Sequence, residues 1–143
     1  MVAIGLEAYD DEVLKFHCKK GFSTKQWHRA IEKLRANDLG VKTYLLFKPP
    51  FMSEGDALNH CVEWIRAIAH LSDEVSVNPM NIQRRTIVDR LFRNREYRPP
   101  WLWSLVDMIE RVHPVDGRLI VHPTAAGKIR GAHNCGKCDR EVA

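Results

Sequence analysis

The chain has 143 residues, of which 45% are hydrophobic and 28% are charged. This length suits one globular domain, and the composition excludes wholesale disorder, collagen and a coiled coil. The 22 basic and 18 acidic residues give a formal charge of +4, which permits an anionic partner without requiring one. The sequence has neither an apolar run of membrane-span length nor a secretory signal, so we expect a cytoplasmic protein that does not enter a membrane.

The first half of the chain alternates short apolar runs with amphipathic segments. Val2–Glu7 predicts a strand, and Asp10–Lys20 predicts a helix after it. Ser23 and Gln26 form a capping box, which begins a second helix with apolar residues on one face. Val41–Phe47 predicts the second strand.

The second half continues the same alternation. Ser53 caps a long amphipathic helix, and Glu74–Val77 predicts a third strand. Asn81 is the expected cap of the next helix, and Pro99-Pro100 precedes another. Leu119–Val121 predicts a fourth strand. Strands separated by helices indicate βαβ crossovers and therefore an α/β fold with a parallel sheet.

Four strands predict part of a barrel or sheet rather than a complete one. The first strand begins almost at residue 1, so we interpret the chain as a piece of a longer protein or a truncated gene product. The expected division is a partial barrel over residues 1–121 and a tail over residues 122–143. An open edge along the first strand predicts self-association through that strand, or its coverage by the tail.

Three stretches of the sequence resemble radical S-adenosylmethionine enzymes. Residues 4–8, 21–24 and 41–44 are similar to the middle of the barrel in MiaB-like and Elongator-like members. Residues 77–84 with 97–104, and residues 130–139, resemble the radical S-adenosylmethionine family of archaeosine biosynthesis, RaSEA. The string Tyr-Arg-Pro-Pro-Trp-Leu-Trp-Ser at 97–104 is the most specific signal. The resemblance covers nearly the whole chain and begins near the fourth strand of the barrel.

This resemblance implies the C-terminal half of a radical S-adenosylmethionine (β/α) barrel. It implies a full-length lyase that converts a lysine-adduct deazaguanine to archaeosine in archaeal tRNA, together with a partner protein that first attaches the lysine. S-adenosylmethionine and a 4Fe–4S cluster are the implied cofactors of that enzyme. Two alternatives stay open: another MiaB- or Elongator-like enzyme with a different RNA substrate, or a non-catalytic binding or assembly module.

The cysteines depart from the family pattern. Family members hold the cluster with Cys-x3-Cys-x2-Cys, whereas the four cysteines here are at positions 18, 61, 135 and 138. Three thiolates are needed to hold the cluster and leave one iron open for S-adenosylmethionine. We therefore expect this chain alone to be inactive and to bind no cofactor tightly.

Polar residues follow the predicted strands at their carboxyl ends, where ligands gather in parallel α/β folds. The resemblance places contacts to cofactor or substrate at Glu7, Lys48, Asn78 and Asn81. Each residue also has a structural interpretation: Glu7 can cap the next helix, Lys48 can be an ordinary surface lysine, and the asparagines can stabilise turns.

Six arginines lie within fifteen residues, beside Tyr97, Trp101 and Trp103. Guanidinium groups suit phosphates, and aromatic rings stack on unpaired bases. The segment therefore predicts RNA binding, and the alternative is a solvated helix face over a tryptophan-rich core. The six are Arg84, Arg85, Arg90, Arg93, Arg95 and Arg98.

A last motif lies near the C-terminus. His133, Cys135 and Cys138 place three soft ligands within six residues, and His122 can supply a fourth. This spacing is compatible with zinc, although the second Cys-x-x-Cys pair of a typical zinc site is missing. The alternative is a reduced tail without metal.

Overall fold

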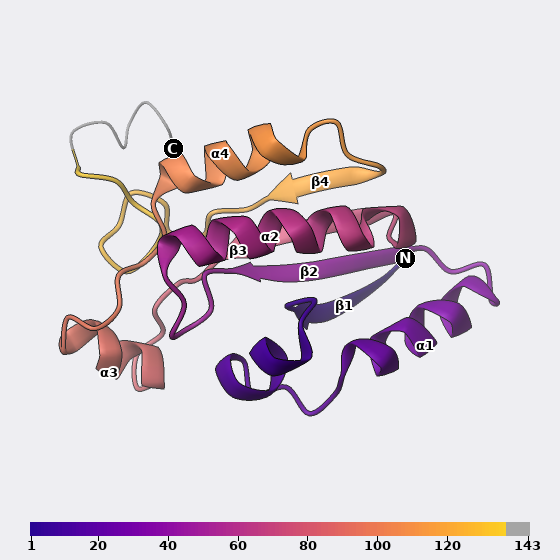
Figure 1. The fold of residues 1–143 in the computed structure, drawn as a ribbon, viewed down its shortest axis with the longest axis horizontal. Helices are drawn as coiled ribbons and strands as arrows, with labels where there is room; N and C mark the ends of the chain where they lie inside the picture. The colour runs from indigo at the N-terminus through magenta and orange to yellow at the C-terminus, as the bar shows by residue number, and fades with distance from the viewer. Residues whose placement is uncertain (137–143) are drawn as a thin grey trace.

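The computed structural model describes residues 1–136 and contains one four-stranded parallel sheet (Figure 1). Its strands lie in chain order, β1–β2–β3–β4, so each crossover places the next strand beside the previous one. This arrangement confirms the predicted α/β fold with a parallel sheet. The strands are β1 (Val2–Glu7), β2 (Val41–Phe47), β3 (Glu74–Pro79) and β4 (Arg118–Val121).

Helices connect the strands, and Figure 1 shows α2 lying across the middle of the sheet with α1 toward β1 and α4 toward β4. Their bounds are α1 (Thr24–Arg35), α2 (Glu54–Ile68) and α4 (Leu102–Val112). The predicted capping box of Ser23 and Gln26 and the cap by Ser53 are both confirmed. A 3-10 turn, η2 (Ala69–Leu71), follows α2.

The core lies between the sheet and these helices. Val41, Leu45 and Phe47 alternate along β2 and are fully buried, as the period of two in a strand requires. The intervening side chains of β2 point to the opposite face and are only half-buried. Near the amino ends of the strands, that face carries an ionic group in which Glu74 pairs with Lys42 and, at 3.4 Å, with Arg118.

The helix predicted over Asp10–Lys20 is wrong in extent, because only one π-helical turn forms there, η1 (Val13–His17). The Asp10 carboxylate accepts hydrogen bonds from the backbone N–H groups of Glu12 and Val13, which starts a single turn. Lys19 then adopts a left-handed backbone with φ of 54°, which an α-helix does not tolerate. The segment therefore becomes a turn-rich connection at the carboxyl end of β1.

The helix expected after Asn81 begins later, at α3 (Ile87–Arg93). Thr86 is the actual cap, because its hydroxyl accepts a hydrogen bond from the backbone N–H of Asp89 at 3.2 Å. Strand β3 also continues to Pro79, two residues beyond the predicted end. Figure 1 shows α3 beyond the carboxyl ends of the strands, at a distance from the sheet.

Residues 122–136 form turns that pack against α3 and the start of α4. The backbone N–H of Ile82 donates to the carbonyl of Arg130 at 2.8 Å, and that of His133 donates to the carbonyl of Pro100 at 3.1 Å. Ala132 is fully buried. A Cβ atom added to Gly131 would lie 2.2 Å from the carbonyl oxygen of Ala125, so only glycine allows this close approach.

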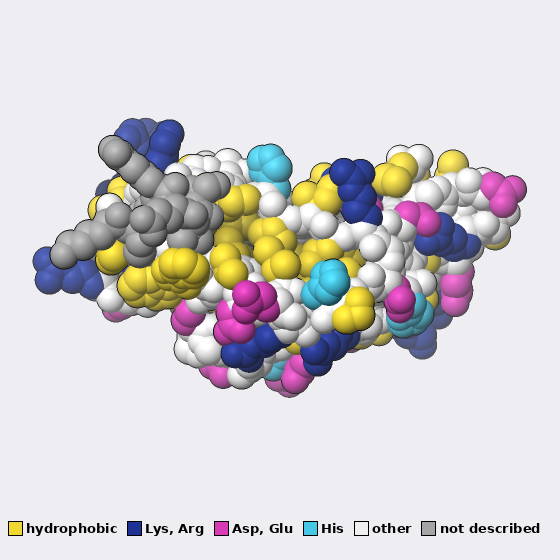
Figure 2. All heavy atoms as spheres, turned by 90° about the horizontal axis from the view of Figure 1, so that it is seen from above, with side chains coloured by type: hydrophobic (Ala, Val, Ile, Leu, Met, Phe, Trp, Pro, Cys, Tyr) yellow, Lys and Arg dark blue, Asp and Glu magenta, His cyan; other side chains and the backbone are white. Residues whose placement is uncertain are grey.

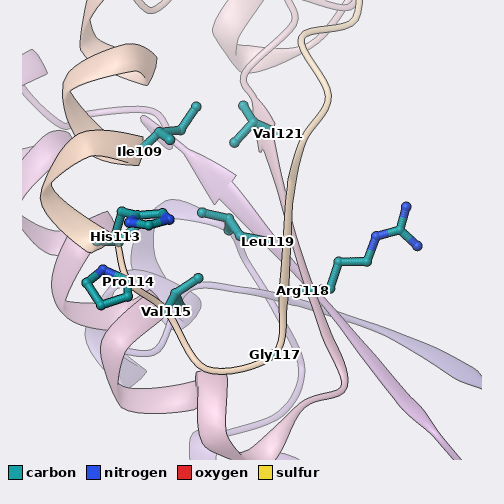
Figure 3. A pocket seen from close by; sticks show the side chains of 9 residues that line it. Ile109, His113, Pro114, Val115, Gly117, Arg118, Leu119 and Val121 are labelled. Carbon is teal, nitrogen blue, oxygen red and sulfur yellow. The ribbon is translucent and has the colours of Figure 1, made fainter.

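An apolar groove of about 540 Å³ lies between α4 and β4. Figure 2 shows hydrophobic side chains exposed in the middle of this face, and Figure 3 shows Ile109, Leu119 and Val121 directed into the groove while Arg118 points away. Within residues 1–136, β1 and β4 each pair with a strand on one side only. Self-association through β1 therefore stays a prediction. No helix in the described part of the chain is long and apolar enough to cross a membrane.

Candidate functional site

Backbone strain gathers in the turns around the carboxyl ends of the strands. A non-glycine residue in the left-handed region costs on the order of 1 kcal/mol, and such residues cluster at functional sites. Because turns near α3 and after β1 and β2 hold most of the strained residues, this edge of the sheet is the candidate site. These residues are Glu7, Lys19, Lys48, Phe51, Arg85 and Arg95, with φ between 54° and 73°.

Glu7 ends β1, where the pairing with β2 is irregular. Its carboxylate lies 3.1 Å from the ammonium of Lys20, and both side chains remain partly accessible to solvent. Burial and the nearby charge of Glu7 raise the pKa of the Cys18 thiol to about 11. Cys18 is therefore protonated near neutral pH, and the carboxylate of Glu7 is an accessible anion at the end of β1.

Lys48 follows β2, and its side chain is buried. The ammonium donates hydrogen bonds to the Glu54 carboxylate at 2.7 Å and to the backbone carbonyl of Arg98 at 2.8 Å. The hydroxyl of Tyr97 donates to the backbone carbonyl of Lys48 at 2.8 Å, and burial raises the pKa of Tyr97. Lys48 thus holds the end of β2 against the segment before α4, and a ligand contact by its ammonium stays a prediction.

Asn78 and Asn81 lie at the end of β3 and just after it, and both are half-buried. Among the described residues, neither amide side chain forms a hydrogen bond, so both remain available to a polar ligand. Strand β2 separates β1 from β3, which places Glu7 and Asn78 roughly 10 Å apart across the sheet.

The six predicted RNA-binding arginines divide into two groups. Arg93 forms an ion pair with Asp89 at 2.9 Å, and Arg98 stacks over the ring of Trp101 at 3.6 Å and donates to the carbonyl of His133 at 2.8 Å. The other four are exposed, and within residues 1–136 their guanidinium groups have no ion pair. These four are Arg84, Arg85, Arg90 and Arg95.

Asp89 makes the central contacts of this region, although the sequence alone did not single it out as a site residue. The side chain is only 2% exposed and accepts hydrogen bonds from the backbone N–H of Arg85 at 2.9 Å and from Arg130 at 2.6 Å, in addition to Arg93. The Arg85 N–H, followed by the two guanidinium charges, holds the pKa of Asp89 below its usual range. Asp89 thereby joins the turn before α3, α3 itself and the C-terminal segment.

Removing the Asp89 charge is expected to destabilise the protein in a pH-dependent way. A carboxyl group with a lowered pKa stabilises the fold above its unfolded pKa of about 3.9, and that stabilisation is lost as the pH falls through the folded value. We expect Asp89→Asn to lower Tm at pH 7, with a difference from wild type that shrinks below about pH 4. Thermal melts followed by circular dichroism across this pH range measure it.

The control is Asp107→Asn, because Asp107 also pairs with an arginine four residues later, Arg111, but is far more exposed. An exposed pair of this kind contributes little, so its Tm is expected to change little. Equal losses of Tm in both variants, or a loss for Asp89→Asn that does not depend on pH, would contradict this role.

The predicted C-terminal metal ligands are only partly described. His133 donates from Nδ1 to the carbonyl of Gly131 at 2.9 Å, Cys135 is exposed, and Cys138 lies outside the described residues. His122 is exposed after β4. Within residues 1–136, no three His, Cys, Asp or Glu side chains come together in a way that would hold a metal ion. The zinc site therefore stays a prediction.

Within residues 1–136 the cysteines do not come together as a site for an iron–sulfur cluster, and the third of them, Cys135, is exposed. Cys61 is fully buried in the core against the sulfur of Met108, at 3.3 Å, and burial raises its pKa. Cys18 also has a raised pKa, as described above. A cluster needs several thiolates facing one point, whereas these two thiols are held in the protonated form.

Comparison with known proteins gives three relatives over nearly the whole chain, two of which carry the same name. No family model matches the chain. It is 37% identical to archaeosine synthase subunit beta of Methanosarcina acetivorans over 99% of its length, and 40% identical to the protein of that name from Thermococcus kodakarensis over 94%. An uncharacterised protein of Methanocaldococcus jannaschii is 28% identical over 96% of the chain. The chain spans 42% of the length of each of the first two relatives.

A solved structure shares the fold. The Elp3 protein of Methanocaldococcus infernus, truncated at its N-terminus, superposes with a TM-score of 0.74 at 17% identity, covering 99% of this chain and 34% of that one. At this identity the similarity supports the fold alone. The two sequence relatives carry the assignment further: this chain is homologous, over nearly its whole length, to part of archaeosine synthase subunit beta, which confirms the resemblance seen in its sequence.

Proposed function

We propose that this chain is the C-terminal barrel section of an archaeosine synthase subunit, a radical S-adenosylmethionine enzyme that converts a lysine-adduct deazaguanine to archaeosine in archaeal tRNA. The observation that carries the proposal is the 37–40% identity to two archaeosine synthase beta subunits over 94–99% of the chain. The parallel sheet has helices over one face (Figure 1) and, along β2, only half-buried side chains on the other, which agrees with a section of a barrel.

The proposed role of this chain in that reaction is to bind the cofactor, the substrate and the tRNA. In such enzymes S-adenosylmethionine bound to a 4Fe–4S cluster supplies the radical chemistry. The cysteines within residues 1–136 do not form a site for that cluster. The carboxylate of Glu7 and the amides of Asn78 and Asn81 offer acceptors and donors to the hydroxyl and amino groups of that cofactor or of the substrate. All three residues lie at or just after the carboxyl ends of β1 and β3, where ligands bind in this class of fold.

The exposed arginines around α3 supply the proposed contact with tRNA. Four guanidinium groups without an ion pair in the described chain lie on α3 and on the turns before and after it, a region in which the buried Asp89 makes the central contacts. Guanidinium groups recognise phosphates through paired N–H donors. A second synthase subunit is the other proposed partner, and the cytoplasm is the proposed location.

The test of this function is the binding of unmodified tRNA at several salt concentrations, measured by fluorescence anisotropy. Four phosphate contacts predict a slope of about −3 in a plot of log affinity against log salt, or roughly a 50-fold loss between 50 and 200 mM. Absence of binding at low salt, or an affinity that does not change with salt, would contradict the RNA contact.

A non-catalytic RNA-binding or assembly module is the second candidate. The 143 residues contain no Cys-x3-Cys-x2-Cys, which such a module would lack and which a C-terminal section of the enzyme would lack as well. Both candidates predict RNA binding, and they differ in whether the chain takes part in the cleavage of S-adenosylmethionine.

A further inference from the structure

A hollow of about 350 Å³ lies between the C-terminal end of α3 and the segment 129–133. Phe92, Arg95 and Glu96 line it from the side of α3, while Ile129 and His133 line it from the C-terminal segment. Its size matches the lower end of the range for small-molecule sites. The hollow is therefore formed by two segments that are distant in the sequence, residues 92–99 and residues 129–133.

The side of the hollow formed by the C-terminal segment presents an exposed apolar side chain on a fixed backbone. Ile129 is 70% exposed, whereas Gly131 and Ala132 beside it are buried. Arg130 fixes the segment, because its guanidinium donates to the Asp89 carboxylate at 2.6 Å and to the Ile82 carbonyl at 3.3 Å. Ile129 is therefore held out toward solvent, where its apolar side chain is open to contact with the apolar surface of a ligand.

Besides His133 and Tyr97, the polar side chains that line the hollow are those of Arg98, Arg95 and Glu96. Arg98 is fixed flat, stacked over Trp101 at 3.6 Å and hydrogen-bonded to the carbonyl of His133. Arg95, with φ of 61°, and Glu96 are exposed at the rim, and among residues 1–136 neither side chain has an ion pair. The carboxylate repels a phosphate on its side and can accept an N–H from a base, whereas Arg95 attracts a phosphate.

We propose that this hollow binds one unpaired nucleobase of the RNA, with the base packed on Ile129 and a flanking phosphate against Arg95. This inference rests on the proposed RNA contact and adds the form of RNA that is recognised. A base in a duplex is covered on both faces by its neighbours, whereas an unpaired base can leave the stack and enter a hollow with apolar and planar cationic walls.

The test compares Ile129→Ala with Ile87→Ala, a matched control. Ile87 is also exposed, at 57%, and lies on α3 without lining the hollow. The probes are a single-stranded RNA of about ten nucleotides and its duplex with the complementary strand. We expect Ile129→Ala to weaken single-strand binding about fivefold, which is roughly the effect of losing the burial of one methylene group, and to leave duplex binding unchanged. Ile87→Ala is expected to match wild type with both RNAs.

Arg95→Gln provides a second variant, which is expected to weaken single-strand binding and to reduce the salt slope by about one. Identical affinities of Ile129→Ala and Ile87→Ala for the single strand would overturn the hollow as a base site while the salt-dependent RNA contact stands. A loss that is equal for single strand and duplex would also overturn it. If wild type binds neither RNA, the proposed RNA contact fails together with the hollow.

Discussion

The 143-residue chain, reconstituted anaerobically with iron and sulfide, is expected to form no 5′-deoxyadenosine from S-adenosylmethionine. Reductive cleavage needs a cluster held by three thiolates, with one iron open to the cofactor. The sequence lacks the three-cysteine spacing, Cys61 is buried in the core, and the pKa of Cys18 is raised to about 11. Chromatography of the reaction with dithionite as reductant measures the product.

The control for this assay is the same protein without dithionite. Formation of 5′-deoxyadenosine that requires both the protein and the reductant would contradict the prediction, and it would mean that cysteines outside the family spacing hold an active cluster. Absence of product combined with salt-dependent tRNA binding would agree with a chain whose own share is binding.

The second large effect is expected for the triple variant Arg84→Gln, Arg85→Gln, Arg90→Gln. These side chains are exposed and without an ion pair in the described part of the chain, so their removal leaves no buried charge uncompensated. Loss of three phosphate contacts is expected to reduce the salt slope by about 2 to 3 and to weaken tRNA binding at least tenfold at low salt. Fluorescence anisotropy with labelled tRNA measures both quantities.

A triple variant on α1 controls for net charge. Lys25, Arg29 and Lys33 are exposed on that helix, and Lys25→Gln, Arg29→Gln, Lys33→Gln removes the same three positive charges. We expect this variant to bind tRNA nearly as well as wild type. Equal losses in the two triple variants would show that RNA binding depends on overall charge and would contradict the role assigned to the α3 surface, which is formed by Arg84, Arg85, Arg90 and Arg95.

The main features of the fold could be predicted because they depend on local patterns. The alternation of buried residues along β2 and the capping box of Ser23 and Gln26 need no distant partner. The start of α3 could not be chosen in this way, since Asn81 and Thr86 are both good caps. Thr86 is the one used because Asp89, three residues later, is fixed by Arg130 from the far end of the chain.

The site was harder to predict because the roles of its residues depend on distant contacts. Lys48 looks like a surface lysine in the sequence, but its ammonium is fixed by the carbonyl of Arg98, fifty residues later. Arg93 and Arg90 look alike, yet only Arg93 reaches the buried Asp89. Two local signals exist for Asp89: its spacing from Thr86, which indicates a cap, and its spacing from Arg93, which indicates a helical ion pair. The contact with Arg130 has no local signal.

Amide hydrogen exchange, followed by mass spectrometry with and without saturating unmodified tRNA, tests the central claim most directly. If tRNA binds to the α3 surface and the adjoining hollow, amide exchange in residues 84–98 and 129–133 is expected to slow when tRNA is bound. Exchange in α1 (Thr24–Arg35) is expected to stay unchanged. Protection of α1 without protection of residues 84–98, or no change anywhere at saturating tRNA, would contradict the account.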